Sequence, residues 1–179
     1  MREIESKAVT QAVRQLCIDA NCHLGEDVKE CIRCSRREET WPVAQGILDN
    51  LVKNYEIAAE HEIAICQDTG MACVFVEIGQ EVHVAGNLEE AIHEGVRQGY
   101  HDGCLRCSVV GDPLRRVNTK DNTPAMIYYD IVPGDGLKIT VAPKGFGSEN
   151  MGAIKMLKPA DGVEGVIKFV VDTVRSAGP

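Results

Sequence analysis

The sequence has few aromatic residues, no excess of basic residues and no long hydrophobic run. Among its 179 residues only 4% are Phe, Trp or Tyr, so the core must consist mainly of Val, Ile, Leu, Ala and Met. The formal net charge of −8 argues against a nucleic-acid partner, which requires a basic face. No apolar run approaches the ~20 residues that span a bilayer, and the N-terminus has no signal-peptide pattern. We therefore expect a cytoplasmic protein with neither nucleic acid nor membrane as a partner.

Cysteine, by contrast, is abundant, with eight residues in the chain. Because no secretion signal is present, reduced thiols fit this count better than disulfides do. Four of the cysteines form two Cys-x-x-Cys pairs, Cys31 with Cys34 and Cys104 with Cys107. Such pairs can hold structural zinc, which leaves a non-catalytic zinc-binding scaffold subunit as one alternative. Zinc ribbons, however, place their pairs ~15–20 residues apart, and the separation here is far longer.

Helical periodicity dominates the first third of the sequence. Apolar residues recur near the helical period from Glu3 to Leu24, and a second helix is predicted to open at Glu26. A third helix is predicted after Thr40, which serves as the N-cap, with Pro42 in the first turn, where its missing N–H does no harm. We therefore expect residues 1–62 to be helical.

Strand patterns follow in the rest of the chain. Residues 71–79 have the composition of a strand, and Asn87 with a glutamate three residues later has the form of a capping box that opens a helix. Two further strands, residues 125–132 and 137–141, flank a Pro-Gly-Asp-Gly sequence. This is the strongest hairpin signal in the chain. A last helix is predicted over residues 161–176.

These patterns predict an α+β fold, in which N-terminal helices are followed by a mainly antiparallel, hairpin-built sheet flanked by helices. A chain of 179 residues is long enough for one domain with a real core and too short for two full ones. We therefore expect a single domain over residues 1–179, helical over 1–62 and made of sheet and helices over 63–179.

The most informative segment is Ile65-Cys66-Gln67-Asp68-Thr69-Gly70. Gly70 permits a tight turn, and the side chains of Asp68 and Thr69 can hydrogen-bond that turn locally. On these residues alone, a buried cysteine beside an ordinary turn is one interpretation. The other is a metal-binding thiol followed directly by polar groups that meet a substrate.

A glycine-rich segment, Gly145-Phe146-Gly147-Ser148, precedes a predicted helix start. Backbone N–H groups in such a segment can bind an anion, helped by the dipole of the helix. The segment is not a P-loop, because no Gly-Lys-Ser/Thr follows the glycines. As a generic glycine-rich loop it is a weak signal.

Taken together, the motifs resemble the class I (iron–sulfur) fumarate hydratase and L-tartrate dehydratase family, specifically its alpha subunit or N-terminal catalytic domain. The resemblance runs from about Trp41 to the last residue. Besides the two segments above, the matching stretches occur in the family's order: Gly95-Val96-Arg97, Leu105-Arg106, Asn118-Thr119, Asp121 to Ala125, Ile131 to Asp135 and Met156 to Val166.

The resemblance implies a [4Fe–4S] cluster held by three cysteines, which leaves one iron open as a Lewis acid. Cys66 corresponds to the first cluster ligand. In the family the second ligand follows an Ala-Gly-Pro, and here Ala177-Gly178-Pro179 closes the sequence. The other two ligands are therefore expected beyond Pro179, as in an alpha subunit truncated before its second cluster cysteine.

The resemblance also implies the substrate contacts. Gln67 and Asp68 are expected to contact the substrate, with Asp68 as the catalytic acid–base candidate. Arg106 is the expected partner of a substrate carboxylate, because its planar guanidinium matches two oxygens. Gly147 is expected to contact the substrate through its backbone.

The expected activity is the reversible hydration of fumarate to malate, and the alternative within the family is dehydration of tartrate. A small dicarboxylate is the expected substrate in both cases. The general base and further cationic contacts are expected from a beta subunit or C-terminal domain of the same enzyme. Because the shared cleft would then be open on one side, we also expect a homo-oligomer.

Overall fold

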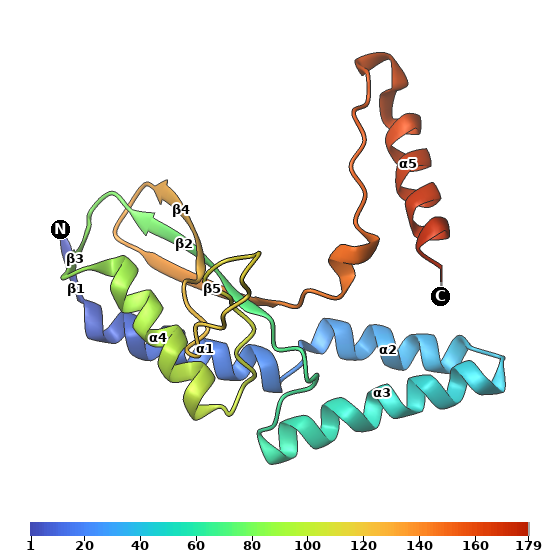
Figure 1. Ribbon diagram of the computed structural model, residues 1–179, viewed down its shortest axis with the longest axis horizontal. Coiled ribbons are helices and arrows are strands. Elements are labelled where there is room, and N and C mark those ends of the chain that lie inside the picture. Colours follow the sequence, from blue (N-terminus) through green and yellow to red (C-terminus); the bar gives the residue numbers. More distant parts are fainter. Residues whose placement is uncertain (179) are drawn as a thin grey trace. The chain divides into compact units, whose positions relative to one another are not determined.

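The computed structural model describes residues 1–178, without the side chains of residues 148 and 149. The chain forms two compact units, residues 1–144 and residues 145–179, which are considered separately below. Figure 1 shows a short strand and then helices at the start of the chain, followed by small sheets and further helices. The predicted α+β class is confirmed.

Two helices, α1 (Ser6–Cys22) and α4 (Leu88–Asp102), pack closely against each other in the first unit. Two glycines of α4 permit this approach. A Cβ at Gly95 would lie 2.8 Å from the carbonyl oxygen of Thr10, and one at Gly99 would lie 2.8 Å from that of Arg14. Replacing either glycine by a residue with a Cβ would therefore push the two helices apart.

The main sheet has the order β4-β2-β5, with β2 (Met71–Gly79) in the centre. β4 (Met126–Val132) pairs with β2 in parallel and β5 (Leu137–Lys144) pairs with it antiparallel. Ala72, Val74 and Val76 of β2 are almost fully buried in the core beside α1 and α4. The sheet thus covers the helix pair with its most apolar strand.

The predicted hairpin between residues 125–132 and 137–141 is wrong in its pairing. Both strands form, but β2 lies between them, and each pairs with β2. The residues joining β4 to β5 bind the end of β2 instead: Gly79 N–H donates to the carbonyl of Gly136 at 2.8 Å. A central apolar strand needs partners on both edges, and the turn sequence does not reveal that requirement.

A second, two-stranded sheet pairs β1 (Arg2–Glu5) in parallel with β3 (Val82–Ala85). The first helix therefore begins at Ser6 and not at Glu3. The helical period extends across this boundary, and only the distant strand partner decides that residues 2–5 are extended.

Helices α2 (Glu26–Glu38) and α3 (Pro42–His61) form a helical hairpin. Trp41, and not Thr40, is the N-cap of α3, and no side chain caps it. The carboxylate of Glu39 accepts the N–H groups of both Thr40 and Trp41 at 2.8 Å. The predicted threonine cap is therefore absent, and the side chain of Glu39 binds the two backbone N–H groups just before the helix instead.

The second unit contains two short 3₁₀ helices, η1 (Ser148–Met151) and η2 (Pro159–Asp161), and the helix α5 (Gly162–Ala177). The last predicted helix is thus present as α5. Across the described residues, no helix is both long and apolar enough to cross a membrane.

Candidate functional site

The segment that contains Cys66 follows α3, and hydrogen bonds to the backbone of Ile65 hold it in place. Ile65 N–H donates to the carbonyl of Asn21 at 2.9 Å, and the side-chain amide of Asn54 donates to the carbonyl of Ile65 at 2.8 Å. The Cys66 thiol itself is exposed, and the N–H of Asp68 points to its Sγ at 3.5 Å. The interpretation of Cys66 as a buried cysteine is therefore wrong.

Asp68 and Gly70 form the turn that the sequence predicted. Gly70 has a φ of +60°, the left-handed region in which glycine carries no steric penalty. Its N–H donates to Oδ1 of Asp68 at 3.2 Å, so the carboxylate stabilises the turn two residues ahead of it. The side chain of Asp68 is half-buried and that of Gln67 is exposed.

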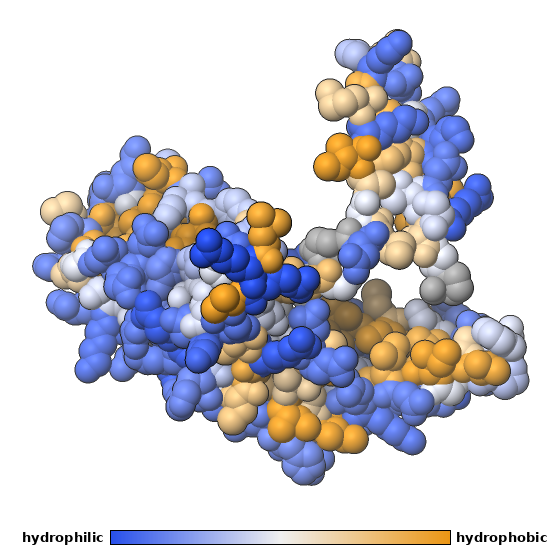
Figure 2. Space-filling model, viewed as in Figure 1, coloured by the Kyte–Doolittle hydropathy of each residue, from blue (hydrophilic) through white to orange (hydrophobic). Residues whose placement is uncertain are grey.

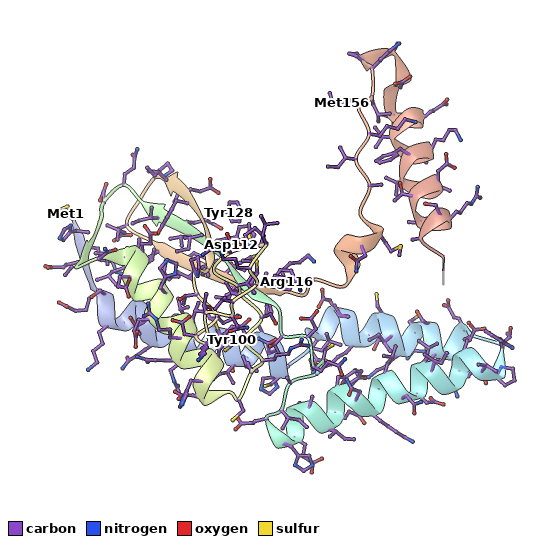
Figure 3. The ribbon with its side chains drawn as sticks, viewed as in Figure 1. Met1, Tyr100, Asp112, Arg116, Tyr128 and Met156 are labelled. Atoms are coloured by element: carbon purple, nitrogen blue, oxygen red, sulfur yellow. The ribbon has the colours of Figure 1, made fainter. Side chains whose placement is uncertain are left out.

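Thr69 links this turn to the rest of the molecule. Its side chain is 2% exposed, and its hydroxyl donates to the backbone carbonyl of Arg106 at 2.9 Å. Its own carbonyl accepts the hydroxyl of Tyr100, a residue of α4, at 2.8 Å. Figure 3 shows Tyr100 where α4 meets the loops. Burial raises the pKa of Tyr100, so the phenol stays a hydrogen-bond donor.

The side chain of Asn122 also joins the turn that contains Thr69 to the segment that contains Arg106. Asn122 is fully buried and has a φ of +59°. Its Oδ1 accepts the N–H groups of Ser108 at 2.7 Å and Val109 at 3.1 Å, and its amide donates to the carbonyl of Gly70 at 3.0 Å. No role was predicted for Asn122 from the sequence, although the asparagines and threonines that surround it (Asn118, Thr119 and Thr123) were a usable signal.

Arg106 differs from the neighbouring Arg97 in its surroundings. The side chain of Arg106 is exposed, and within the described residues no carboxylate pairs with its guanidinium. Arg97 is already bound to three carboxylates, those of Glu90 at 3.1 Å, Glu94 at 2.6 Å and Asp121 at 3.1 Å. Arg97 therefore fixes the loop that carries Asn122, and Arg106 has its charge available for an added ligand.

Asp121 has a perturbed carboxyl group. Burial alone would raise its pKa, but hydrogen bonds from Thr123 and from Arg97 lower the pKa below the ordinary value. The Asp121 carboxylate thus stays ionised beside Asn122 and completes the attachment of this loop to α4.

Gly147 belongs to the second unit and is exposed. It precedes η1, a 3₁₀ helix of four residues, at the position where the sequence predicted a helix start. The dipole available at such a short helix is correspondingly small. That Gly147 acts together with Cys66 and Arg106 stays a prediction.

The two Cys-x-x-Cys pairs lie on different elements. Cys31 and Cys34 are on α2, and Cys104 and Cys107 are on the loop after α4, where they line a cavity of about 580 Å³. Burial raises the pKa of Cys107, so this sulfur stays a thiol. Among the side chains that the structure describes, no group of three or more His, Cys, Asp or Glu residues is positioned to hold a metal ion. The four cysteines therefore form no shared site there.

Comparison with known proteins assigns the chain to a family. The sequence model of the family described as "Fumarate hydratase (Fumerase)" matches residues 10–179. A protein of Methanocaldococcus jannaschii named "Putative L(+)-tartrate dehydratase subunit alpha" is 37% identical over 95% of this chain and 62% of its own length. The "L(+)-tartrate dehydratase subunit alpha" of Escherichia coli is 29% identical in strain UTI89 and 28% in strain K12, in each case over 93% of this chain.

The chain spans 62% of the length of the archaeal relative and 56% of that of the Escherichia coli relatives. The similarity nevertheless covers nearly all of this chain, including the Cys66 turn, Arg106 and Asn122. The chain therefore belongs to the class I fumarate hydratase and L-tartrate dehydratase alpha-subunit family.

Proposed function

We propose that the chain is the alpha-subunit part of a hydro-lyase that removes water from a four-carbon hydroxy-dicarboxylate, with L(+)-tartrate as the best-supported substrate. The observation that carries the proposal is the hydrogen bond between Thr69 and Arg106. This hydrogen bond joins the turn that carries the exposed Cys66 thiol to the loop that carries the exposed Arg106 side chain. The relatives named above support tartrate over fumarate.

Cys66 has the properties expected of one ligand of an iron–sulfur cluster. Its thiol is exposed, so an added group can reach it, and a backbone N–H points to the sulfur at 3.5 Å. Hydrogen bonds to sulfur are one of the means by which proteins tune such clusters. When bound, a [4Fe–4S] cluster with one open iron would supply a Lewis acid for the hydroxyl oxygen that leaves.

The substrate of this proposal carries two carboxylates, and Arg106 is the proposed partner of one of them. Its guanidinium can donate two parallel hydrogen bonds to a carboxylate, which fixes the orientation of the substrate as well as its position. Binding a dianion beside Asp68 costs energy unless a cation is close, so this arginine also offsets the charge of Asp68.

Asp68 is the proposed acid–base residue, and Gln67 is the proposed neutral hydrogen-bonding partner of the substrate. Dehydration removes a hydroxyl from one carbon and a proton from its neighbour, so besides the general base that takes the carbon-bound proton, a group that handles a proton at the departing hydroxyl is needed within reach. The carboxylate of Asp68 is held in place by the N–H of Gly70. Gly147 is proposed to add a backbone contact, as the resemblance implies.

A second polypeptide segment is part of the proposal. The relatives are named as alpha subunits, and we infer that this chain likewise acts with a beta subunit or C-terminal domain. That part would contribute the remaining cationic contacts and the general base. Fumarate hydration is the second candidate, because the matching family is described as fumarate hydratase.

Product analysis on the completed enzyme tests the proposal. The alpha chain, extended to its family length and combined with its beta partner, is reconstituted with iron and sulfide under anaerobic conditions. L(+)-tartrate and L-malate are then compared as substrates, since loss of water from tartrate gives the enol of oxaloacetate and loss of water from malate gives fumarate. Faster turnover of tartrate supports the proposal. Faster turnover of malate favours the second candidate, and inactivity with both overturns the assignment of a hydro-lyase on four-carbon acids.

A further inference from the structure

Cys104 follows the last turn of α4 in a backbone conformation that normally requires glycine. Its φ is +50°, in the left-handed region that few non-glycine residues adopt. Its N–H donates to the carbonyl of His101 at 3.2 Å, and the N–H of Leu105 donates to that of Tyr100 at 2.9 Å. These two hydrogen bonds form a Schellman motif, in which glycine is the usual residue at the position of Cys104. A cysteine there is strained, and strained residues concentrate at functional sites.

A second cysteine, Cys107, lines the same cavity of about 580 Å³ as Cys104 does. Cys104 is exposed and Cys107 is half-buried, and both are free thiols in the structure. The volume of the cavity falls within the ~300–1,000 Å³ of small-molecule sites, so a small reagent can approach both residues. Cys-x-x-Cys is also the spacing of the reversible dithiol pairs of disulfide oxidoreductases.

Between the two cysteines lies Arg106, the proposed partner of a substrate carboxylate. The carbonyl of Arg106 accepts the hydroxyl of Thr69 at 2.9 Å, and the carbonyl of Cys107 accepts the side-chain amide of Asn118 at 2.9 Å. Together with the bonded N–H groups of residues 104 and 105, these contacts set the conformation of the whole segment. A disulfide would impose its own geometry there, because it holds its two Cα atoms ~4.4–6.8 Å apart and its dihedral angle near ~90°.

We propose that Cys104 and Cys107 are a dithiol that a low-molecular-weight disulfide oxidises to an intramolecular disulfide, and that this bond displaces Arg106 and weakens binding of the dicarboxylate. The oxidation itself is independent of what the enzyme acts on. The effect on the dicarboxylate rests on the proposed function, because only there is Arg106 a substrate contact.

The oxidation proceeds in two exchange steps with a reagent R–S–S–R. The thiolate of the exposed Cys104 attacks one sulfur of the reagent, forms the mixed disulfide and expels one R–S⁻. Cys107 then attacks the sulfur of Cys104 and expels the second R–S⁻, which closes the bond. The two released thiolates take up the two protons of the cysteines, so the pair loses two electrons and the reagent becomes two R–SH. Burial and the charge of Asp121 raise the pKa of Cys107, which suits the thiol that reacts second.

The other Cys-x-x-Cys pair, Cys31 and Cys34, provides an internal comparison. Both residues lie within α2, which carries none of the candidate site residues, and the thiol of Cys34 points to a carboxylate oxygen of Glu38 at 3.5 Å. Figure 2 shows hydrophobic residues gathered along the α2–α3 hairpin, whereas the cavity beside Cys104 is lined in part by charged and polar side chains. Oxidation of the α2 pair would leave the candidate site unchanged, so this pair serves as the control.

Peptide mapping of the completed enzyme tests the oxidation. The enzyme, with its beta partner and cluster, is treated anaerobically with oxidised glutathione, blocked at its free thiols and digested with trypsin without reduction. Trypsin cleaves after Arg106, so Cys104 falls in the peptide of residues 98–106 and Cys107 in that of residues 107–115. These two peptides should be joined and should separate on reduction. Unmodified peptides, glutathione on Cys104 alone, or a link to residues 54–97, the peptide with Cys66, would overturn the proposal.

Kinetics on the same samples test the effect on Arg106. Oxidation should lower kcat/KM for the dicarboxylate by about tenfold or more with the iron content unchanged, and a dithiol reductant should restore it. In Arg106→Lys the same oxidation should have a much smaller effect, because the contact that it disturbs is already lost. Joined peptides with an unchanged kcat/KM, or an equal fall in Arg106→Lys, overturn the displacement of Arg106.

Two double variants separate this pair from the other thiols. Cys104→Ser with Cys107→Ser should keep the wild-type kcat/KM and show no response to oxidised glutathione. Cys31→Ser with Cys34→Ser should respond as the wild type does, and the reverse pattern overturns the proposal. Mapping does not need turnover, so joined peptides in an enzyme that is inactive in both states support the dithiol and count against the proposed function alone.

Discussion

The hydroxyl of Thr69 donates a hydrogen bond to the backbone carbonyl of Arg106 at 2.9 Å, although the two residues are 37 positions apart in sequence. This bond joins the turn that begins at Cys66 to the segment that carries the proposed carboxylate-binding arginine. The side chain of Asn122 reinforces it, since it binds Gly70 on one side and Ser108 on the other. The candidate site is therefore positioned by buried polar contacts between loops, and these contacts can be tested individually.

Thr69→Val should lower the free energy of unfolding by about 1–3 kcal/mol, because valine has nearly the same shape and leaves the carbonyl of Arg106 without its donor. Urea denaturation followed by circular dichroism measures the change. Thr140→Val is the matched control, since Thr140 is exposed on β5, and it should shift the value by less than about 0.5 kcal/mol. Equal effects of the two substitutions would contradict the role given to Thr69.

Asn122→Ala should destabilise the protein more, by about 3–5 kcal/mol, because three backbone groups lose their partner in a fully buried position. Asn118→Ala, at an exposed position of the same loop, should cost about 1 kcal/mol. The same denaturation experiment compares them. If Asn122→Ala proves no worse than Asn118→Ala, the loops are held by other contacts.

Asp121 should make the stability of the first unit depend on pH. Its pKa is lowered in the folded state, so the folded protein binds fewer protons there than the unfolded chain does. The resulting stabilisation is fully present above the ordinary aspartate pKa of about 4 and is lost as the pH falls through the lower folded value. The difference in unfolding free energy between wild type and Asp121→Asn should therefore shrink as the pH is lowered. A difference that stays constant with pH would show that ionisation of Asp121 contributes nothing.

Arg106→Lys should lower kcat/KM of the completed enzyme for its dicarboxylate, because lysine keeps the charge but cannot form the paired hydrogen bonds. A charge-assisted pair at a desolvated site is worth ~2–5 kcal/mol, so we expect a loss of more than tenfold with the iron content unchanged. Arg115→Lys, on the exposed part of the same loop, serves as the control and should leave kcat/KM unaltered. Normal kinetics in Arg106→Lys would remove this residue from the site.

Local signals allowed much of the fold to be predicted from the sequence. The strand at residues 71–79 has the predicted bounds, and Asn87 caps α4 by accepting the N–H of Glu90 at 3.1 Å. Features that depend on distant partners were missed. Residues 2–5 are extended only because β3 pairs with them, and β4 and β5 are separated because β2 requires a partner on each edge.

The same distinction applies to the candidate site. The turn between Asp68 and Gly70 is formed by neighbouring residues, and its chemistry could be read from the sequence. The contribution of Asn122 depends on two backbone segments that come together only in the folded chain. Gly147 lies in a separate compact unit, so its part in the site rests on the resemblance alone.

Iron analysis of a Cys66 variant tests whether this cysteine holds the proposed cluster. The completed enzyme, with its beta partner, is compared with Cys66→Ser and with Cys104→Ser, a control at another exposed cysteine. Iron, acid-labile sulfide and the visible absorption of the cluster are measured after anaerobic reconstitution. We expect wild type and Cys104→Ser to carry a [4Fe–4S] cluster and Cys66→Ser to lose most of it together with dehydratase activity. If the Cys66→Ser enzyme keeps a full cluster and normal turnover, Cys66 is not a cluster ligand.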